Sequence, residues 1–179
     1  MNKLNLIVLC IMLISLTSLT VCSLSLLDYP GLFLDEKGHL DITIVVGDMA
    51  DASDTIGSVE IATSLNSEFF NNAEINAVIA SEIYDAKEQN MIVIGGPCAN
   101  SVAAELMNYP IVCSDPINPN TGLIKLYDFG TYKTLLIAGF DAIDTRRAST
   151  VLANYDSFEI PNSSNMEVVN RKEKRVLLR

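Results

Sequence analysis

The sequence has 179 residues, of which 49% are hydrophobic and 19% are charged, and its formal net charge is −10. This composition excludes a disordered chain and a coiled coil, and its length fits one domain with a core. Residues 28–158 hold 19 acidic and 6 basic side chains. Because no basic surface is available to displace counterions from phosphates, we also exclude nucleic-acid binding.

The first segment of the chain, residues 1–25, is predicted to be a leader. Lys3 is its only charge, a long apolar run follows, and Ser23 and Ser25 are small enough for cleavage. The apolar run is also long enough to span a bilayer, so an uncleaved anchor is an alternative to a signal peptide. A lipoprotein modified at Cys22 is a weaker alternative. We expect export, with membrane contact only through this segment if it is uncleaved.

The chain after the leader alternates between strand and helix patterns. In chain order we predict a strand at 40–47, a helix at 51–70, a weaker strand at 76–84, a strand at 91–95, a short helix at 99–108, strands at 122–128 and 131–138, and a helix at 141–155. The predicted apolar face of the first helix comprises Ile56, Val59, Ile61, Ala62 and Leu65. This order predicts an α/β fold with a mainly parallel sheet, helices on both faces and one antiparallel hairpin at Phe129-Gly130.

Three strand-glycine-helix units repeat along the chain, marked by ITIVVG, MIVIGG and TLLIAG. The first and third units continue as Asp-Ala-Ser-Asp-Thr from Asp51 and Asp-Ala-Ile-Asp-Thr from Asp141, which differ at one position. Acidic residues at a helix start cap free N–H groups and oppose the helix dipole. We therefore expect both motifs to begin helices.

One α/β domain is predicted over residues 28–158, followed by a polar and basic tail over residues 159–179 that forms either a terminal strand or a loose extension. Asn162 begins an Asn-Ser-Ser sequon and is a candidate glycosylation site in an exported protein. Cys98 and Cys113 are the cysteines outside the leader, and such a pair in an exported domain predicts a disulfide, with two free buried thiols as the alternative.

Two weak ligand sites are candidates. Gly95 and Gly96 follow a strand and precede a helix, an arrangement that presents N–H groups to a ligand, although no dinucleotide or P-loop motif is present. The carboxylates of Asp48, Asp51 and Asp54 are spaced so that they could share a Ca²⁺, and no other cofactor is expected.

Helix capping explains the carboxylates of Asp51 and Asp54 without a metal. Asp128, Asp141 and Asp144 form a similar weak calcium candidate.

Catalysis is not predicted. His39 is the only histidine and lies in a polar loop, and no Gly-x-Ser-x-Gly motif is present. We expect Arg146 and Arg147 to lie on the solvated side of the last helix.

A resemblance emerges when the segments are taken together. Ile92–Asn100, Cys113, Gly122–Leu126 and Ile137–Ala148 resemble the archaeal S-layer protein family in order and spacing, and Val45–Ala62 resembles the earlier strand and helix of that family. The resemblance implies a secreted, often glycosylated, non-catalytic structural protein of the archaeal cell envelope, which associates with itself or with other envelope proteins. An extracellular ligand- or glycan-binding module is the alternative function. Members of the family are usually longer and have several domains.

Overall fold

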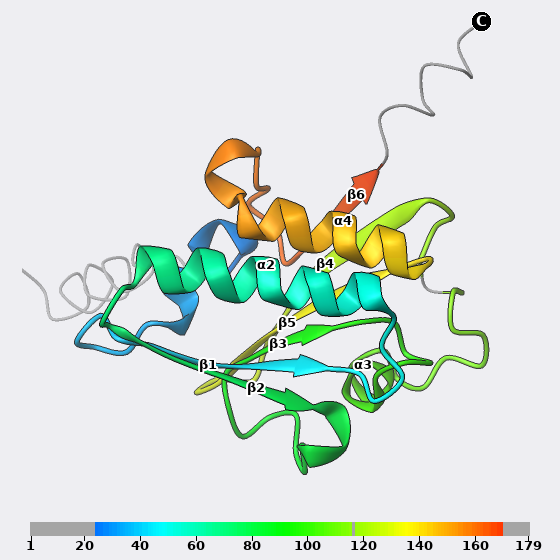
Figure 1. Cartoon of the computed structure of the whole chain (residues 1–179), viewed down its shortest axis with the longest axis horizontal. Coiled ribbons are helices and arrows are strands. Elements are labelled where there is room, and N and C mark those ends of the chain that lie inside the picture. Colours follow the sequence, from blue (N-terminus) through cyan, green and yellow to red (C-terminus); the bar gives the residue numbers. More distant parts are fainter. Residues whose placement is uncertain (1–23, 116, 170–179) are drawn as a thin grey trace, which may run out of the picture.

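The computed structural model describes residues 24–115 and 117–169 (Figure 1). Most of the predicted leader, residues 1–23, and the basic residues from Arg171 onward therefore lie outside the described residues. Within 24–115 and 117–169, no helix is long and apolar enough to cross a membrane.

A six-stranded sheet forms the centre of the molecule, in the order β2-β1-β3-β5-β4-β6. Its strands are β1 Leu40–Val46, β2 Ala73–Ile79, β3 Met91–Ile94, β4 Thr121–Asp128, β5 Lys133–Gly139 and β6 Asn165–Val169. The pairs β1–β2, β1–β3 and β3–β5 are parallel, whereas β4 is antiparallel to both β5 and β6. The predicted mainly parallel sheet with one antiparallel hairpin is confirmed.

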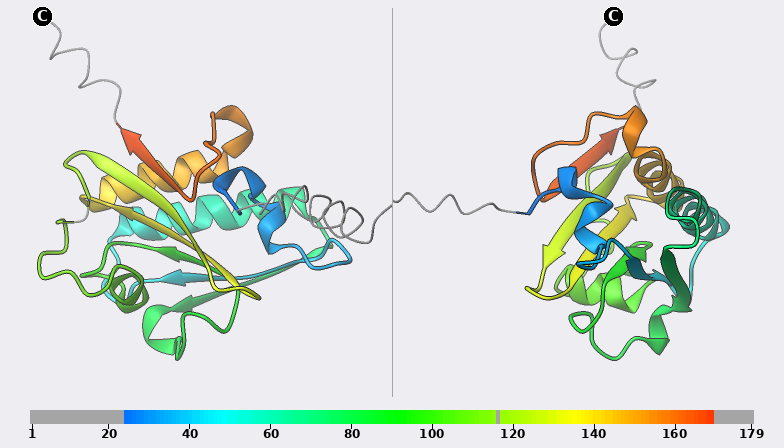
Figure 2. Two further views of the ribbon diagram at one scale, coloured as in Figure 1. Left: turned by 180° about the vertical axis from the view of Figure 1, so that it is seen from behind. Right: turned by 90° about the vertical axis from the view of Figure 1, so that its left-hand side faces the viewer.

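Helices cover both faces of the sheet, as predicted. The two long helices, α2 Ala52–Glu68 and α4 Ala142–Ala153, lie side by side on one face, and the short helix α3 Ser101–Leu106 lies on the other (Figures 1 and 2). Alternation along the strands builds both cores, since successive side chains point to opposite faces. Ile92 and Ile94 of β3 face α2 and α4, whereas Met91 and Val93 face α3.

The chain on either side of residues 28–158 contributes to the same fold. Leu26, in a 3-10 turn before β1, is 2% exposed and joins the core under α2 and α4. Beyond residue 158, the sequence predicts either a terminal strand or a loose extension. The structure has the strand β6 there, and its Val168 is buried in this core.

The predicted apolar face of α2 is wrong in part. Ile61 and Leu65 are fully buried, but Ile56 is 42% exposed and Val59 is 59% exposed. The buried side of the first two turns instead carries small residues, because α2 packs closely against α4 there. A Cβ placed on Gly57 would lie 2.6 Å from the Ser149 hydroxyl oxygen. Because small residues are not strongly hydrophobic, a search for an apolar stripe does not identify the buried side of the helix here.

The prediction that Arg146 and Arg147 lie on a solvated face is also wrong in part, since their side chains are only 39% and 27% exposed. Both guanidinium groups are partly buried and form ion pairs, Arg146 with Glu60 of α2 at 3.2 Å and Arg147 with Asp144. The Arg146 pair crosses between the two long helices. Arg147 compensates a carboxylate that is almost fully buried.

Candidate functional site

A cleft of about 400 Å³ lies where the three repeated units end their strands. Because β1, β3 and β5 are adjacent and parallel, Gly47, Gly95 and Gly139 all lie at the carboxyl edge of the sheet. Ligands of doubly wound sheets bind at this edge. The residues that line the cleft are Met49, Asp51, Asp54, Gly96, Pro97, Cys98, Ala99, Val112, Cys113, Ser114, Gly139, Phe140, Asp141, Ala142 and Thr145.

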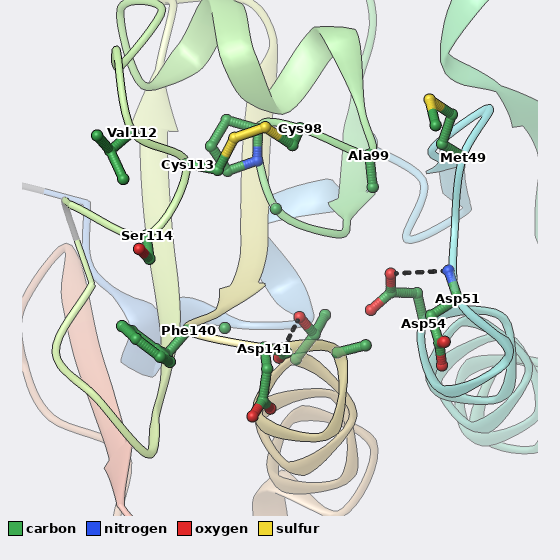
Figure 3. Close-up of a pocket in the computed structure, with 15 residues that line it drawn as sticks. Met49, Asp51, Asp54, Cys98, Ala99, Val112, Cys113, Ser114, Phe140 and Asp141 are labelled. Carbon is green, nitrogen blue, oxygen red and sulfur yellow. Dashed lines mark hydrogen bonds between the residues drawn. A yellow bond between two sulfur atoms is a disulfide. The ribbon is translucent and has the colours of Figure 1, made fainter.

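The two repeated aspartate motifs begin the two long helices, as predicted, and they meet at the cleft (Figure 3). The Asp51 carboxylate accepts a hydrogen bond from Ser53 N at 2.8 Å, and Asp54 accepts one from Asp51 N at 3.4 Å. At the start of α4, Asp141 accepts one from Asp144 N at 3.1 Å. These bonds satisfy N–H groups that the first turn of a helix leaves free.

Glycine is required at two of the strand ends because the backbone approaches another segment closely. A Cβ on Gly47 would overlap the Ala99 carbonyl oxygen, and a Cβ on Gly139 would overlap the backbone nitrogen of Thr145. The glycines that mark the sequence repeat therefore allow the loops and helix starts to pack directly against the sheet.

Asp54 is a buried carboxylate with incomplete hydrogen bonding. It is 3% exposed, and its Oδ1 has no hydrogen-bond partner among the residues that the structure describes. Burial raises the pKa of Asp54 above its ordinary value, while the N–H of Asp51 and the hydroxyl of Thr145 act in the opposite direction. This wall of the cleft thus holds a carboxylate whose charge is poorly compensated.

The predicted disulfide between Cys98 and Cys113 is confirmed, with the two Cα atoms 5.6 Å apart. It joins the turn after β3 to the loop that leads to β4, and both cysteines line the cleft opposite the helix starts (Figure 3). The disulfide therefore fixes one wall of the cleft.

The candidate glycines have different positions. Gly96 lines the cleft, whereas Gly95 is buried in the turn, with a φ of 113° that favours glycine. The helix that follows is capped by the buried Asn100, whose side-chain oxygen accepts hydrogen bonds from Val102 N and Ala103 N. Ligand binding at Gly95 and Gly96 stays a prediction.

Asp48 lies apart from the other two calcium candidates. Its carboxylate accepts hydrogen bonds from the backbone N–H and the hydroxyl of Ser81, after β2, while Asp51 and Asp54 cap α2. Residues 24–115 and 117–169 contain no group of three or more His, Cys, Asp or Glu side chains able to hold a metal ion. A shared Ca²⁺ stays a prediction, without such a group to support it.

The remaining predicted residues lie outside the cleft. Asn162 is exposed in the loop before β6, so its side chain is accessible, and its glycosylation stays a prediction. His39 lies in the loop before β1, as expected. Asp128 forms an ion pair with Lys133 across the β4–β5 hairpin at 3.0 Å, far along these strands from Asp141 and Asp144.

The rim of the cleft is apolar, and the sequence prediction missed it. Met49, Val112 and Phe140 line the cleft and are 79%, 50% and 41% exposed. Each lies within a few residues of a motif that was recognised, but only the parallel order of β1, β3 and β5 brings them together. The cleft thus combines exposed apolar side chains with the carboxylates of Asp51, Asp54 and Asp141, which suits neutral or cationic groups better than anions.

Comparisons with known proteins identify one domain. No curated protein matches the sequence. A solved structure titled "Structure of CpGH84D" is similar at 12% identity with a TM-score of 0.44, and the match covers 71% of this chain but only 19% of that one. A likeness at this level carries no argument about activity. Residues 73–155, from the start of β2 to just beyond α4, match the S-layer like family, outer domain, and this chain therefore contains an S-layer-like domain.

Proposed function

We propose that this chain is a non-catalytic structural protein of an archaeal cell envelope, exported to the cell surface, where it associates with copies of itself or with other envelope proteins. The observation that carries the proposal is the family match over residues 73–155, which supports a structural role at the cell surface. The match includes four of the strands and both α3 and α4, so it covers the part of the fold that builds the cleft wall and the hairpin.

Exposed apolar side chains at the carboxyl edge support a role in association. Besides the rim of the cleft, Tyr109, Ile111 and Ile143 are 68%, 101% and 53% exposed. Large exposed apolar side chains that gather on one side of a soluble domain are typical of interaction sites. We infer that this edge of the molecule contacts other envelope subunits.

Electron microscopy of the purified protein tests the proposal. The full chain is expressed in an exporting host, so that the disulfide forms, and is examined over a range of salt with and without Ca²⁺. We expect sheets or regular oligomers. A protein that stays monomeric in every condition contradicts the proposal.

Two matched variants test the contact surface. Ile111→Lys places a charge at the carboxyl edge, whereas Phe70→Lys places one at a side chain that is 73% exposed after α2, at the opposite end of the molecule. We expect the first variant to prevent assembly and the second to leave it intact. Equal assembly of the two variants would remove the carboxyl edge from the proposal.

Mass spectrometry of the protein from its native cells tests export and modification. An N-terminus after residue 23 would indicate a cleaved leader, and an intact Met1 would indicate an anchored protein. Added sugar mass on the peptide that contains Asn162 would establish glycosylation.

The cleft favours a second candidate function, an extracellular module that binds a small ligand or a glycan. Its volume of about 400 Å³ and its mixture of apolar and polar lining are typical of ligand sites. A thermal-shift screen with neutral glycans and nucleosides tests this function. A true ligand should raise the unfolding temperature of the native protein and of Ser157→Trp, but not of Ser114→Trp, which fills the cleft. No shift with any compound would count against binding.

A further inference from the structure

The free edge of β2 has an unusual composition for an exposed edge strand. β2 is the first strand in the sheet order and pairs with β1 on one side, and residues 24–115 and 117–169 supply no strand for its other side (Figures 1 and 2). The register with β1 runs without interruption from Leu40 and Ala73 to Val46 and Ile79. The edge is therefore regular over seven residues.

Soluble proteins protect such edges with lysines, prolines, bulges or very short strands, because a free edge recruits other strands. The sequence of β2, Ala-Glu-Ile-Asn-Ala-Val-Ile, contains neither lysine nor proline, and Glu74 is its only charge. The opposite edge of the sheet differs. β6 has five residues, and the side chain of its Glu167 accepts a hydrogen bond from Asn118 at 3.0 Å.

The β2 sequence is self-complementary when two copies run antiparallel. A two-fold axis at Asn76 overlaps all seven residues and places Ala73 opposite Ile79 of the second strand and Ile75 opposite Ala77. These four residues share one face of the strand, because side chains alternate. Glu74 then lies opposite Val78 rather than opposite another Glu74. On the face of Ala73, Ile75, Ala77 and Ile79, apolar residues meet apolar residues, and on neither face are like charges paired across the strands.

The end of the strand is also held in place. Ser81 N donates a hydrogen bond to Asp48, in the loop after β1, at 3.0 Å. Ile79 N, which faces the free edge, donates one to the Glu82 carboxylate at 3.2 Å, and Glu82 gives up this bond when Ile79 pairs with Ala73 of a second strand. Ile79 itself is 47% exposed. A pre-ordered edge loses less conformational freedom on association, which favours binding.

We propose that β2 pairs antiparallel with β2 of a second copy, about a two-fold axis at Asn76, and so joins two sheets into one. The inference rests on the proposed function, which it deepens by naming one contact between subunits. A single pair of seven-residue strands is much smaller than a standard interface of about 1,600 Å². The contact is therefore weak in an isolated pair and gains strength when a layer combines it with other contacts.

Cysteine cross-linking tests the register. The full chain carries Cys10→Ser and Cys22→Ser, so that the introduced cysteine is the only free thiol. Asn76→Cys places two thiols next to each other across the axis, and we expect it to form covalent dimers at least about tenfold faster than Ser67→Cys on the exposed side of α2, because pairing raises the effective thiol concentration. Equal rates for the two variants would overturn the inference.

A second pair of variants distinguishes this register from other contacts. Glu74→Cys alone should form few dimers, because its own counterpart is four residues away along the strand pair. A mixture of Glu74→Cys and Val78→Cys should form the mixed dimer. Efficient dimers of Glu74→Cys alone, with none of the mixed dimer, would overturn the proposed register.

Charge at the axis tests whether assembly uses the edge. Asn76→Lys opposes two positive charges across the axis, and Asn66→Lys adds the same charge on exposed α2. We expect Asn76→Lys to abolish assembly and Asn66→Lys to preserve it. If the native protein assembles and Asn76→Lys does so equally well, the edge inference fails and the proposed function stands. If Asn76→Cys dimerises but no condition gives larger assemblies, the edge contact holds and the surface-layer function fails.

Discussion

The β1–α2 and β5–α4 units begin their helices with nearly the same five residues but leave their buried aspartates in different surroundings. Asp144 is 1% exposed, and Arg147, three residues later, forms an ion pair with it. Asp54 is 3% exposed, but the residue three positions later is Gly57. Gly57 contacts Ser149 of α4, where a larger side chain would not fit.

The helix position three residues after the buried aspartate therefore serves a different purpose in each unit, as Gly57 in α2 and as Arg147 in α4. In α4 the position supplies a cation for a buried carboxylate. In α2 it allows the two helices to approach, and as a result no cation among residues 24–115 and 117–169 forms an ion pair with the carboxylate of Asp54. Burying a charge without a partner is costly. Both units therefore share the same helix start, but the packing between α2 and α4 determines whether the charge of the buried aspartate is balanced by a cation.

Gly139→Ala should have the largest effect among changes in these units. Its Cβ would lie 2.2 Å from the backbone nitrogen of Thr145 at the start of α4, and overpacking of this kind costs about 3 kcal/mol. Chemical denaturation measures the loss. Gly31→Ala is the control, because its Cβ would meet nothing within 4 Å. Similar stabilities for the two variants would show that the start of α4 can move away from β5 at little cost.

The middle unit, β3–α3, is held by a covalent bond instead of a long helix. Replacing both Cys98 and Cys113 with Ala should lower the free energy of unfolding by about 3 kcal/mol, since the bond closes a loop of this length in the unfolded chain. The two cysteines are 15 residues apart. Denaturation of the double variant beside the native protein measures the loss. Unchanged stability would mean that the unfolded chain is already constrained near these residues.

Arg147→Met tests charge compensation in the β5–α4 unit. It keeps most of the side-chain volume but leaves the Asp144 carboxylate buried without its cation, and we expect a loss of about 2 kcal/mol because the arginine itself is partly solvated. Arg146→Met is the matched control. Its partner Glu60 is 29% exposed, so we expect a loss below about 1 kcal/mol. Equal losses of stability for the two variants would show that the buried ion pair of Arg147 contributes no more than the more exposed pair of Arg146.

Asp54→Asn tests the β1–α2 unit and should have the smallest effect. Burial raises the pKa of Asp54 above its ordinary value of 3.8, so the folded state binds this proton more tightly than the unfolded state. The resulting stability is present at low pH and is lost as the pH rises through the raised pKa. Asn does not ionise, so Asp54→Asn should gain stability relative to the native protein as the pH rises above about 4. Asp41→Asn, on the exposed side of β1, controls for the loss of one negative charge.

Local signals in the sequence predicted most of the fold. The β-branched runs that end in glycine predicted β1, β3 and β5, and the aspartate motifs predicted the starts of α2 and α4, because both signals act over a few residues. The sequence does not decide between a strand and a loose extension for β6, since its five residues pair only with β4, far away in the chain. The face of α2 was wrong because the Gly57 contact with Ser149 depends on how two helices meet.

The cleft was predictable only in its parts. Gly96, Cys98, Cys113 and the aspartates were recognised separately. Their position at one edge follows from the adjacency of β1, β3 and β5, which the order of elements along the chain does not specify. The role of Thr145 beside Asp54 also depends on this adjacency, because the two residues come from different helices.

The burial of the first described turn limits where a leader can be removed. Leu26 N lies in the fold and donates a hydrogen bond to the Ser163 carbonyl oxygen at 2.8 Å. A cut between Ser25 and Leu26 would place a charged terminal ammonium at this buried position. A cut one bond earlier would place it at Ser25, whose nitrogen lies 2.7 Å from an oxygen of the Asp28 carboxylate. The folded domain therefore accommodates a mature chain that begins at Ser25 or earlier far better than one that begins at Leu26.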